Sequence, residues 1–206
     1  MKSSGLEPIP QRSEISWDYQ QPEFYKFSED SIFLSKQVLR RVRENMRILD
    51  VGSGCGVVGL EIIRESNFKG QVDFLEIQAE YKPYFEANKV YLNAFNANFI
   101  LGDYSKTTLE KKYHLIVSNP PYFAPKDFRR GPDIKKNICR FFLNGDLDNL
   151  LSFFKKHLDP NGVGVFLCRE LGFLEKYQST FSFNVIKKDE KTNLIEVFPL
   201  DIKGGK

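Results

Sequence analysis

The fold is decided by the stretch Arg47-Ile48-Leu49-Asp50-Val51-Gly52-Ser53-Gly54-Cys55-Gly56. Its first half is a short apolar run, which predicts a buried strand over about 47–52. Its second half is a glycine loop, and the residues that follow it predict a helix over about 56–66. A glycine turn between a strand and a helix lets the backbone approach a ligand closely, while the helix N-terminus favours polar or anionic ligand groups.

A second informative stretch is Asn119-Pro120-Pro121-Tyr122, which directly follows the apolar run at 113–118. Neither proline has an N–H to donate, so the predicted strand must end at Asn119 with a stiff backbone. Asn119 and Tyr122 are then held in a fixed relative geometry. Carboxamide and carbonyl oxygens beside an aromatic ring suit a planar group with an NH2, because the oxygens accept its hydrogens and the ring stacks on its plane. By itself the motif is also compatible with a simple strand-ending turn.

Two ligands compete for the glycine loop. The spacing of Gly54, Gly56 and Gly59 fits a dinucleotide fingerprint, which would make the chain a nicotinamide oxidoreductase. Glu76, at the end of the strand predicted over about 72–77, would bind ribose hydroxyls in either case. Asp50 distinguishes the two candidate ligands. A carboxylate is unfavourable beside the pyrophosphate of a dinucleotide, and it is favourable beside the ammonium and sulfonium groups of S-adenosylmethionine. This favours S-adenosylmethionine.

With these motifs the chain resembles the class I S-adenosylmethionine-dependent methyltransferases, from about residue 19 to about residue 203. The Asn-Pro-Pro-Tyr stretch resembles the motif of the branch that methylates amino or amide nitrogens. The resemblance implies that Asp103 contacts the adenine of the cofactor. The implied catalytic residues are Asn119, Pro120, Pro121 and Tyr122. The implied cofactor-binding residues are Asp50, Gly52, Ser53, Gly54, Gly56, Glu76, Ile77, Asp103, Tyr104 and Asn119.

The order of predicted elements agrees with this family. Strands are expected near 47–52, 72–77, 97–102, 113–118 and 162–168, and helices near 30–43, 56–66, 79–94, 146–158 and 170–178. Ser28 is a candidate N-cap, and Asp159-Pro160-Asn161-Gly162 predicts a turn. The segments 183–188 and 194–198 predict an antiparallel hairpin. We therefore expect an α/β, Rossmann-like seven-stranded methyltransferase fold, with a mainly parallel sheet and helices on both faces.

Length and composition bound the remaining possibilities. The 206 residues are enough for one full domain, which we expect over 19–206, after a flexible segment at 1–18. No apolar run is long enough to span a bilayer, and the N-terminus does not resemble a signal peptide. The cysteines and histidines lack the spacing of a metal site, so no metal is expected. A reduced cytoplasmic location is the simplest interpretation.

The net charge of the chain does not indicate a substrate, but the charge of one segment does. The chain has 30 Lys and Arg against 27 Asp and Glu, a net charge of +3 that does not by itself indicate nucleic acid. Directly after Tyr122, however, a basic stretch could hold phosphates beside a target base, or could be a solvated loop. The predicted substrate- or RNA-binding residues are Asp30, Phe123, Lys126, Arg129, Arg130, Lys135, Lys136 and Arg140.

The best detailed resemblance is to the bacterial tRNA adenine-N6 methyltransferases, through the segment 24–34, Glu76-Ile77-Gln78 and Asn119–Phe123. It implies N6 methylation of an adenine in tRNA. One departure is Cys139-Arg140-Phe141-Phe142, where that family has Ala-Arg-His-Glu. The alternatives are a glutamine N5-methyltransferase acting on release factors, a ribosomal RNA base methyltransferase, and a non-catalytic S-adenosylmethionine-binding protein that recognises RNA. The sequence leaves the oligomeric state open.

Overall fold

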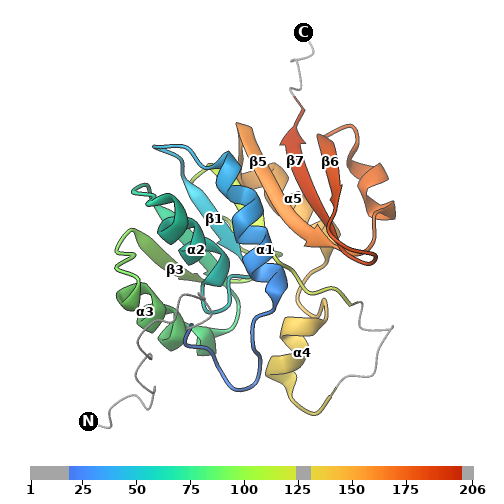
Figure 1. Cartoon of the computed structure of the whole chain (residues 1–206). Coiled ribbons are helices and arrows are strands. Elements are labelled where there is room, and N and C mark those ends of the chain that lie inside the picture. Colours follow the sequence, from blue (N-terminus) through green and yellow to red (C-terminus); the bar gives the residue numbers. More distant parts are fainter. Residues whose placement is uncertain (1–18, 124–130, 201–206) are drawn as a thin grey trace, which may run out of the picture.

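A seven-stranded sheet forms the centre of the molecule (Figure 1). The computed structural model describes residues 19–123 and 131–200, so the predicted segment 1–18 lies outside the described residues. The strands are β1 Ile48–Val51, β2 Val72–Glu76, β3 Ala97–Leu101, β4 Tyr113–Ser118, β5 Leu158–Cys168, β6 Phe181–Lys187 and β7 Asn193–Pro199. Their order across the sheet is β3-β2-β1-β4-β5-β7-β6. The first five strands are parallel, and β6 and β7 form the predicted antiparallel hairpin. Strand β7 also pairs antiparallel with β5.

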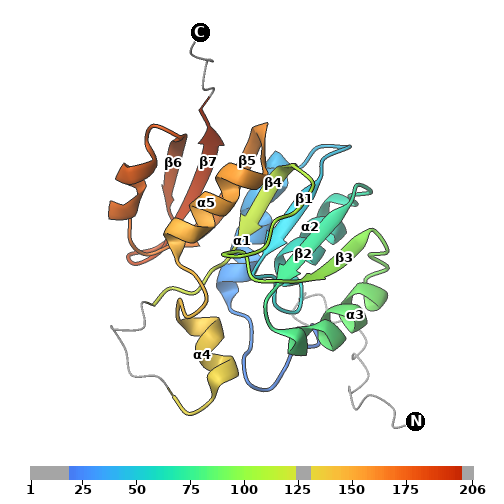
Figure 2. The ribbon, with the colours of Figure 1, turned by 180° about the vertical axis from the view of Figure 1, so that it is seen from behind.

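Helices cover both faces of the sheet. They are α1 Glu29–Val38, α2 Val57–Ser66, α3 Lys82–Tyr91, α4 Ile134–Arg140 and α5 Leu147–His157, with 3-10 helices η1 Leu39–Arg41, η2 Ala79–Tyr81 and η3 Gly172–Tyr177. One apolar core joins the sheet to α1, α2 and α3 (Figure 1). A second core joins the opposite face to α5 and η3 (Figure 2). Within the described ranges, no helix combines the length and apolar character needed to cross a membrane.

Close packing of α2 on β2 places the glycine loop. Gly59 lies in the first turn of α2, where an added Cβ would come within 2.4 Å of the Phe74 ring. The absence of a side chain therefore allows the helix to approach the strand. Gly56 precedes the helix with a φ of 90°, and its position would bring an added Cβ within 2.8 Å of Phe85. Both glycines thus let the start of α2 pack closely, Gly59 against β2 and Gly56 against α3.

Three predicted elements differ in their details. The helix expected over 170–178 is the 3-10 helix η3, which packs mainly through Leu174. The helix expected over 30–43 ends at Val38 and continues as η1, and Ser28 is its N-cap residue without a side-chain capping bond. The turn predicted at 159–162 lies inside β5. There β4 advances from Tyr113 to Leu115 while β5 advances from Leu158 to Val163, so the turn is accommodated as a bulge.

Helix α4 lies in the basic stretch that was considered a possible solvated loop. Asp133 is its N-cap, and the side chain accepts hydrogen bonds from the backbone N–H groups of Lys135 at 2.9 Å and Lys136 at 3.1 Å. An Asp directly before the first helical residue is a recognisable start signal. Figure 1 shows α4 below the carboxyl ends of the parallel strands.

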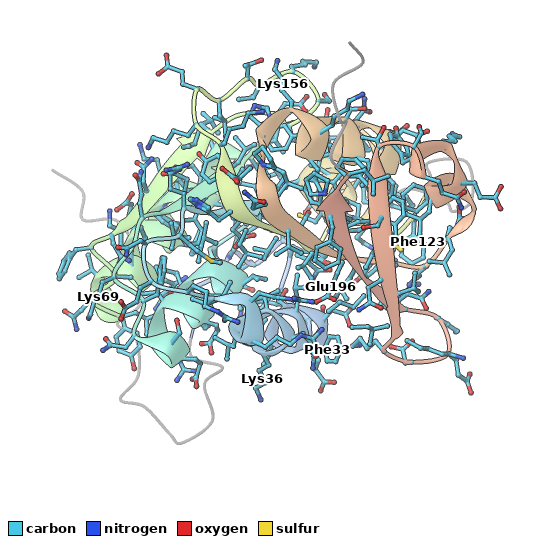
Figure 3. The ribbon with its side chains drawn as sticks, turned by 90° about the horizontal axis from the view of Figure 1, so that it is seen from above. Phe33, Lys36, Lys69, Phe123, Lys156 and Glu196 are labelled. Atoms are coloured by element: carbon cyan, nitrogen blue, oxygen red, sulfur yellow. The ribbon has the colours of Figure 1, made fainter. Side chains whose placement is uncertain are left out.

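A buried carboxylate joins the C-terminal hairpin to the region after α1. The Glu196 side chain on β7 is 1% exposed and accepts hydrogen bonds from Arg40 at 3.0 Å and Arg41 at 2.9 Å. Asn184 on β6 adds a third at 2.8 Å. Burial by itself would raise the pKa of Glu196, but the hydrogen bonds from Arg41, Asn184 and Arg40 outweigh it and lower the pKa to about 2. The position of Glu196 is visible in Figure 3.

We expect Glu196→Gln to lower the free energy of unfolding by about 2 kcal/mol at pH 7, because hydrogen bonds to a charged group are lost. Denaturant titration measures this change. Because the folded pKa is depressed from 4.5 to about 2, the stabilisation is complete above the unfolded pKa and is lost as pH falls toward about 2. The control is Lys176→Gln, which breaks an exposed ion pair with Asp148 and should change stability little. Equal losses of stability in Glu196→Gln and Lys176→Gln would contradict the stabilising role of Glu196.

Candidate active site

A cavity of about 350 Å³ opens at the carboxyl ends of the parallel strands. Its lining comes from the glycine loop after β1, from the ends of β2 and β4, and from the residues after β3. Further walls come from the segment before α1, from α4 and from the end of β5. The volume lies within the roughly 300–1,000 Å³ that is usual for small-molecule and cofactor sites. Open parallel sheets bind ligands at this edge.

Within the glycine loop, Gly52 leaves an open approach to the backbone. Its φ is 68°, and an added Cβ would meet no atom within 4 Å. Ser53 and Gly54 also line the cavity. Gly56 does not, and its contacts with Phe85 give it a packing role instead. The Ser53 Oγ is buried and has no hydrogen-bond partner among the described residues, so it is available to a ligand.

Two buried carboxylates face the cavity from β1 and β2. Asp50 Oδ2 accepts a hydrogen bond from the Gly59 N–H at 2.9 Å. Glu76 uses one oxygen to accept from the Gly54 N–H at 2.8 Å and the other to accept from the Gln78 N–H at 2.9 Å. Each carboxylate oxygen has further lone pairs, so both groups hold the loop in place and can still accept from a ligand.

Burial disfavours the charged forms of both acids. It raises the pKa of Asp50 to about 7, against the opposing hydrogen bond from Gly59 and with a small addition from the charge of Glu76. Burial likewise raises the pKa of Glu76 in spite of its backbone hydrogen bonds from Gln78 and Gly54. A cationic ligand group would favour ionised carboxylates here, so the site is suited to a ligand that carries positive charge.

The residues after β3 complete this side of the cavity. Asp103 Oδ1 accepts hydrogen bonds from the Ser105 N–H at 2.9 Å and from its hydroxyl at 2.7 Å. Oδ2 lies 3.3 Å from Lys106 Nζ and has no hydrogen-bond partner in the described part of the chain. Ile77 and Tyr104 also line the cavity.

On the other side of the cavity, Asn119 and Tyr122 contact each other directly. The Tyr122 hydroxyl lies 2.7 Å from Asn119 Oδ1 and 2.9 Å from Asp30 Oδ2. Asn119 Nδ2 donates to the Ser31 hydroxyl at 3.2 Å. The Tyr122 hydroxyl has a single proton, so it donates to either Asp30 or Asn119 at one time, and Asn119 Oδ1 keeps a second lone pair for a ligand. Pro120 and Pro121 also line the cavity.

Asp30 contacts Tyr122 and Lys188 within the protein, so its carboxylate is not freely available to bind RNA. Its Oδ1 forms an ion pair with Lys188 at the end of the β6–β7 hairpin, and its Oδ2 accepts from Tyr122. Burial, followed by the nearby charge of Asp30, raises the pKa of Tyr122 well above its usual value, so the hydroxyl keeps its proton. Tyr122 and Lys188 therefore compete with a substrate for the predicted contact with Asp30.

The predicted basic residues separate into three groups. Lys126, Arg129 and Arg130 lie outside the described residues. Lys135 forms an ion pair with Glu80 at 3.0 Å, and neither Lys135 nor Lys136 lines the cavity. Arg140 does line it, with its guanidinium 5.9 Å from the centroid of the Phe123 ring.

Two further residues at the site, Arg169 and Gln78, are absent from the predicted set of site residues. Arg169 follows β5, and its guanidinium lies 4.7 Å from the Tyr122 ring centroid and 5.0 Å from that of Phe123. Gln78 Oε1 is buried without a hydrogen-bond partner in the described ranges, while its Nε2 lies 3.2 Å from the Cys139 sulfur. Arg169 immediately follows a parallel strand, and that position is the signal that could have found it.

This arrangement agrees with a known family. A family model described as the methyltransferase small domain matches residues 26–146. The chain belongs to this family. Membership confirms the predicted class of methyltransferase and implies a methyl donor of the S-adenosylmethionine type.

Several curated relatives are about equally similar to the chain. The ribosomal RNA small subunit methyltransferase C of Buchnera aphidicola is 30% identical over 84% of this chain and 46% of the relative. The tRNA1(Val) (adenine(37)-N6)-methyltransferase of Dickeya chrysanthemi is 32% identical over 66% of this chain and 54% of the relative. The release factor glutamine methyltransferase of Fusobacterium nucleatum is 32% identical over 58% of this chain and 34% of the relative. The chain thus spans about half the length, or less, of these relatives.

Solved structures support the predicted fold. TrmN from Thermus thermophilus matches with a TM-score of 0.61 and 17% identity, over 81% of this chain and 48% of that one. The glycopeptide N-methyltransferase MtfA, solved in complex with sinefungin, matches with a TM-score of 0.61 and 10% identity over 84% of this chain and 95% of that one. The Rossmann-like methyltransferase fold is therefore confirmed.

We expect the affinity for S-adenosylmethionine to rise with pH through about 7, because ionised Asp50 pairs with the cationic ligand and protonated Asp50 does not. Between pH 7.5 and pH 5.5 the affinity should fall roughly tenfold. Isothermal titration calorimetry measures it. Asp50→Asn keeps the acceptor for Gly59 but cannot ionise, so it should bind more weakly at pH 7.5 and lose most of this pH dependence. The same pH dependence in both proteins would contradict the role of Asp50.

Proposed function

We propose that this chain is an S-adenosylmethionine-dependent N-methyltransferase that methylates the N6 amino group of an adenine in tRNA. The observation that carries the proposal is the position of Asn119-Pro120-Pro121-Tyr122. The motif lines the same cavity as Asp50 and Glu76, so an amino group held by the motif would lie beside a ligand held by the two acids. We further propose that residues 19–206 form one catalytic domain, which works in the cytoplasm where tRNA is found.

The donor side of the cavity fits S-adenosylmethionine, which supplies a methyl group on a positively charged sulfur. Asp50 would face the ammonium and sulfonium, and Glu76 would accept from the ribose hydroxyls. Asp103 would accept from the adenine amino group, with Ile77 and Tyr104 beside it. The support is chemical, since Ser53 Oγ and Gln78 Oε1 are buried polar atoms without a hydrogen-bond partner among the described residues, and Asp103 Oδ2 is buried with only its ion pair to Lys106.

The acceptor side would orient the target nitrogen. The base would leave its stack, which costs least for a base in a single-stranded loop, and would lie against the Tyr122 ring. Asn119 Oδ1 and the Pro120 carbonyl would accept its two amino hydrogens and so aim the nitrogen lone pair at the methyl carbon. Methyl transfer would form the nitrogen–carbon bond as the carbon–sulfur bond of the cofactor breaks, and the amino proton, by then acidic, would leave to water. Positioning and electrostatics would supply most of the acceleration.

The choice of tRNA rests on the segment 24–34 and on charge. Tyr25, Phe27, Ser28, Asp30 and Ser31 from that segment line the cavity, so the stretch that resembles the tRNA adenine enzymes contributes to its wall. Arg140 and Arg169 add positive charge to the same wall. The similarity to the rRNA and release factor relatives keeps an rRNA base and a glutamine side chain as the competing substrates. The complete Asn-Pro-Pro-Tyr motif argues against a non-catalytic RNA-binding protein.

A labelling experiment tests the proposal. The purified chain is incubated with radiolabelled S-adenosylmethionine and, in separate tubes, with total bacterial tRNA, ribosomal RNA, DNA and release factors. We expect label in tRNA that is recovered as N6-methyladenosine after digestion. Label on release factor glutamine or on ribosomal RNA would replace the proposed substrate. Bound cofactor without label in any tube would favour the non-catalytic alternative.

A further inference from the structure

Two arginines lie against one aromatic side chain at the acceptor side of the cavity. The guanidinium of Arg140, at the end of α4, lies 5.9 Å from the centroid of the Phe123 ring, and that of Arg169, after β5, lies 5.0 Å from it. Arg169 is also 4.7 Å from the Tyr122 ring. All four side chains line the cavity. Because Arg169 lies over the Tyr122 ring, a base would stack on the ring face that Arg169 leaves open, with the two cations nearby.

Their charges are not neutralised within residues 19–123 and 131–200. Neither Arg140 nor Arg169 forms an ion pair or donates a side-chain hydrogen bond in these ranges, and both side chains are exposed. Other cations near the cavity do have acidic partners, since Lys135 pairs with Glu80 and Lys188 with Asp30. A guanidinium that stacks on an aromatic ring keeps its N–H edge free, and that edge matches the two oxygens of a phosphate.

We propose that Arg169, together with Arg140, binds the phosphates that flank the target nucleotide and thereby selects a nucleic-acid strand over a protein side chain. This inference rests on the proposed function and specifies its substrate class. A nucleotide turned out of its stack carries one phosphate on each side, and two separate guanidiniums can serve them. A glutamine side chain offers no anion at this position, so the same two charges would contribute nothing to its binding.

Arg169 has a second conceivable role, which is only to hold the Tyr122 ring in place. The two roles make different predictions. A ring support would affect every substrate equally, with or without a phosphate, and would leave the salt dependence of RNA binding unchanged. A phosphate ligand affects RNA more than the free nucleoside adenosine, and its removal makes RNA binding less sensitive to salt.

The test uses the full chain, a fluorescein-labelled RNA stem-loop with adenines in its loop, and adenosine as the phosphate-free substrate. RNA affinity is measured by fluorescence anisotropy at several salt concentrations, and methylation of both substrates is measured with radiolabelled S-adenosylmethionine. The variants are Arg169→Gln, Arg169→Lys and Arg140→Gln. The control is Lys69→Gln, which removes one exposed positive charge well away from Phe123 (Figure 3).

We expect Arg169→Gln to weaken RNA binding about tenfold at low salt and to reduce the slope of log affinity against log salt by about 0.7, the value for one phosphate contact on a single strand. Arg140→Gln should act in the same direction, and Arg169→Lys should restore part of the affinity through its charge. The loss of methylation should be larger for RNA than for adenosine. Lys69→Gln should leave affinity and slope nearly unchanged.

Three outcomes would overturn the inference. One is an effect of Arg169→Gln on RNA affinity and salt slope no larger than that of Lys69→Gln. Another is an equal loss of methylation on RNA and adenosine with an unchanged slope, which would assign Arg169 to ring support. The third is a wild-type chain that does not bind the RNA. RNA binding that depends on Arg169 without methylation of adenine would support the phosphate contact while contradicting the proposed reaction.

Discussion

The parallel pairing of β1 with β2 and β4 determines where the candidate site can form. Val51 is in register with Leu75 on one side and with Ser118 on the other, so all three strands end at the same edge of the sheet. Cross-strand hydrogen bonds fix the loops that follow, because Gly52 N–H donates to the Leu75 carbonyl at 2.8 Å and the Ser118 hydroxyl donates to the Val51 carbonyl at 2.9 Å. A slip of one residue would turn these side chains to the opposite face. The proposed donor and acceptor sides of the cavity are therefore next to each other because β1, β2 and β4 are adjacent in the sheet.

The acceptor side also depends on the two ends of the described chain. Asp30 comes from α1 and Lys188 from the β6–β7 hairpin, 158 residues later, and their ion pair lies beside the Tyr122 hydroxyl. Glu196 on β7 makes a second connection of the same kind, through Arg40 and Arg41. The antiparallel hairpin thus has two roles. It completes the sheet, and it carries Lys188, the ion-pair partner of Asp30. This gives a physical reason for an N-terminal segment and a C-terminal hairpin to belong to one site.

Much of the fold and the donor side could be predicted from the sequence because their signals are local. Asp50, Glu76 and Asp103 each lie within two residues of the carboxyl end of a strand, and parallel strands bring their carboxyl ends together. The bulge in β5 was misjudged as a turn that separates two elements, since the proline and glycine at 160 and 162 are turn residues in either setting. The contact of Asp30 with Lys188 had no local signal, and the position of Arg169 directly after β5 indicates the edge of the cavity but not its contact with Tyr122. Both contacts follow from tertiary packing, which joins residues that no spacing rule relates.

The central claim is that the main role of Asn119 is to orient the accepting nitrogen, and that its predicted contact with the cofactor contributes little to cofactor affinity. Asn119→Ala separates these roles when single-turnover methylation of tRNA and calorimetric binding of S-adenosylmethionine are measured on the same protein, with the exposed Asn161→Ala as the control. Loss of a preorganised polar contact at the reacting group typically costs about 10²–10³ in rate. We predict a loss of about that size, with cofactor affinity nearly unchanged. Equal losses of methyl transfer and cofactor affinity, or full methylation by the variant, would contradict the account.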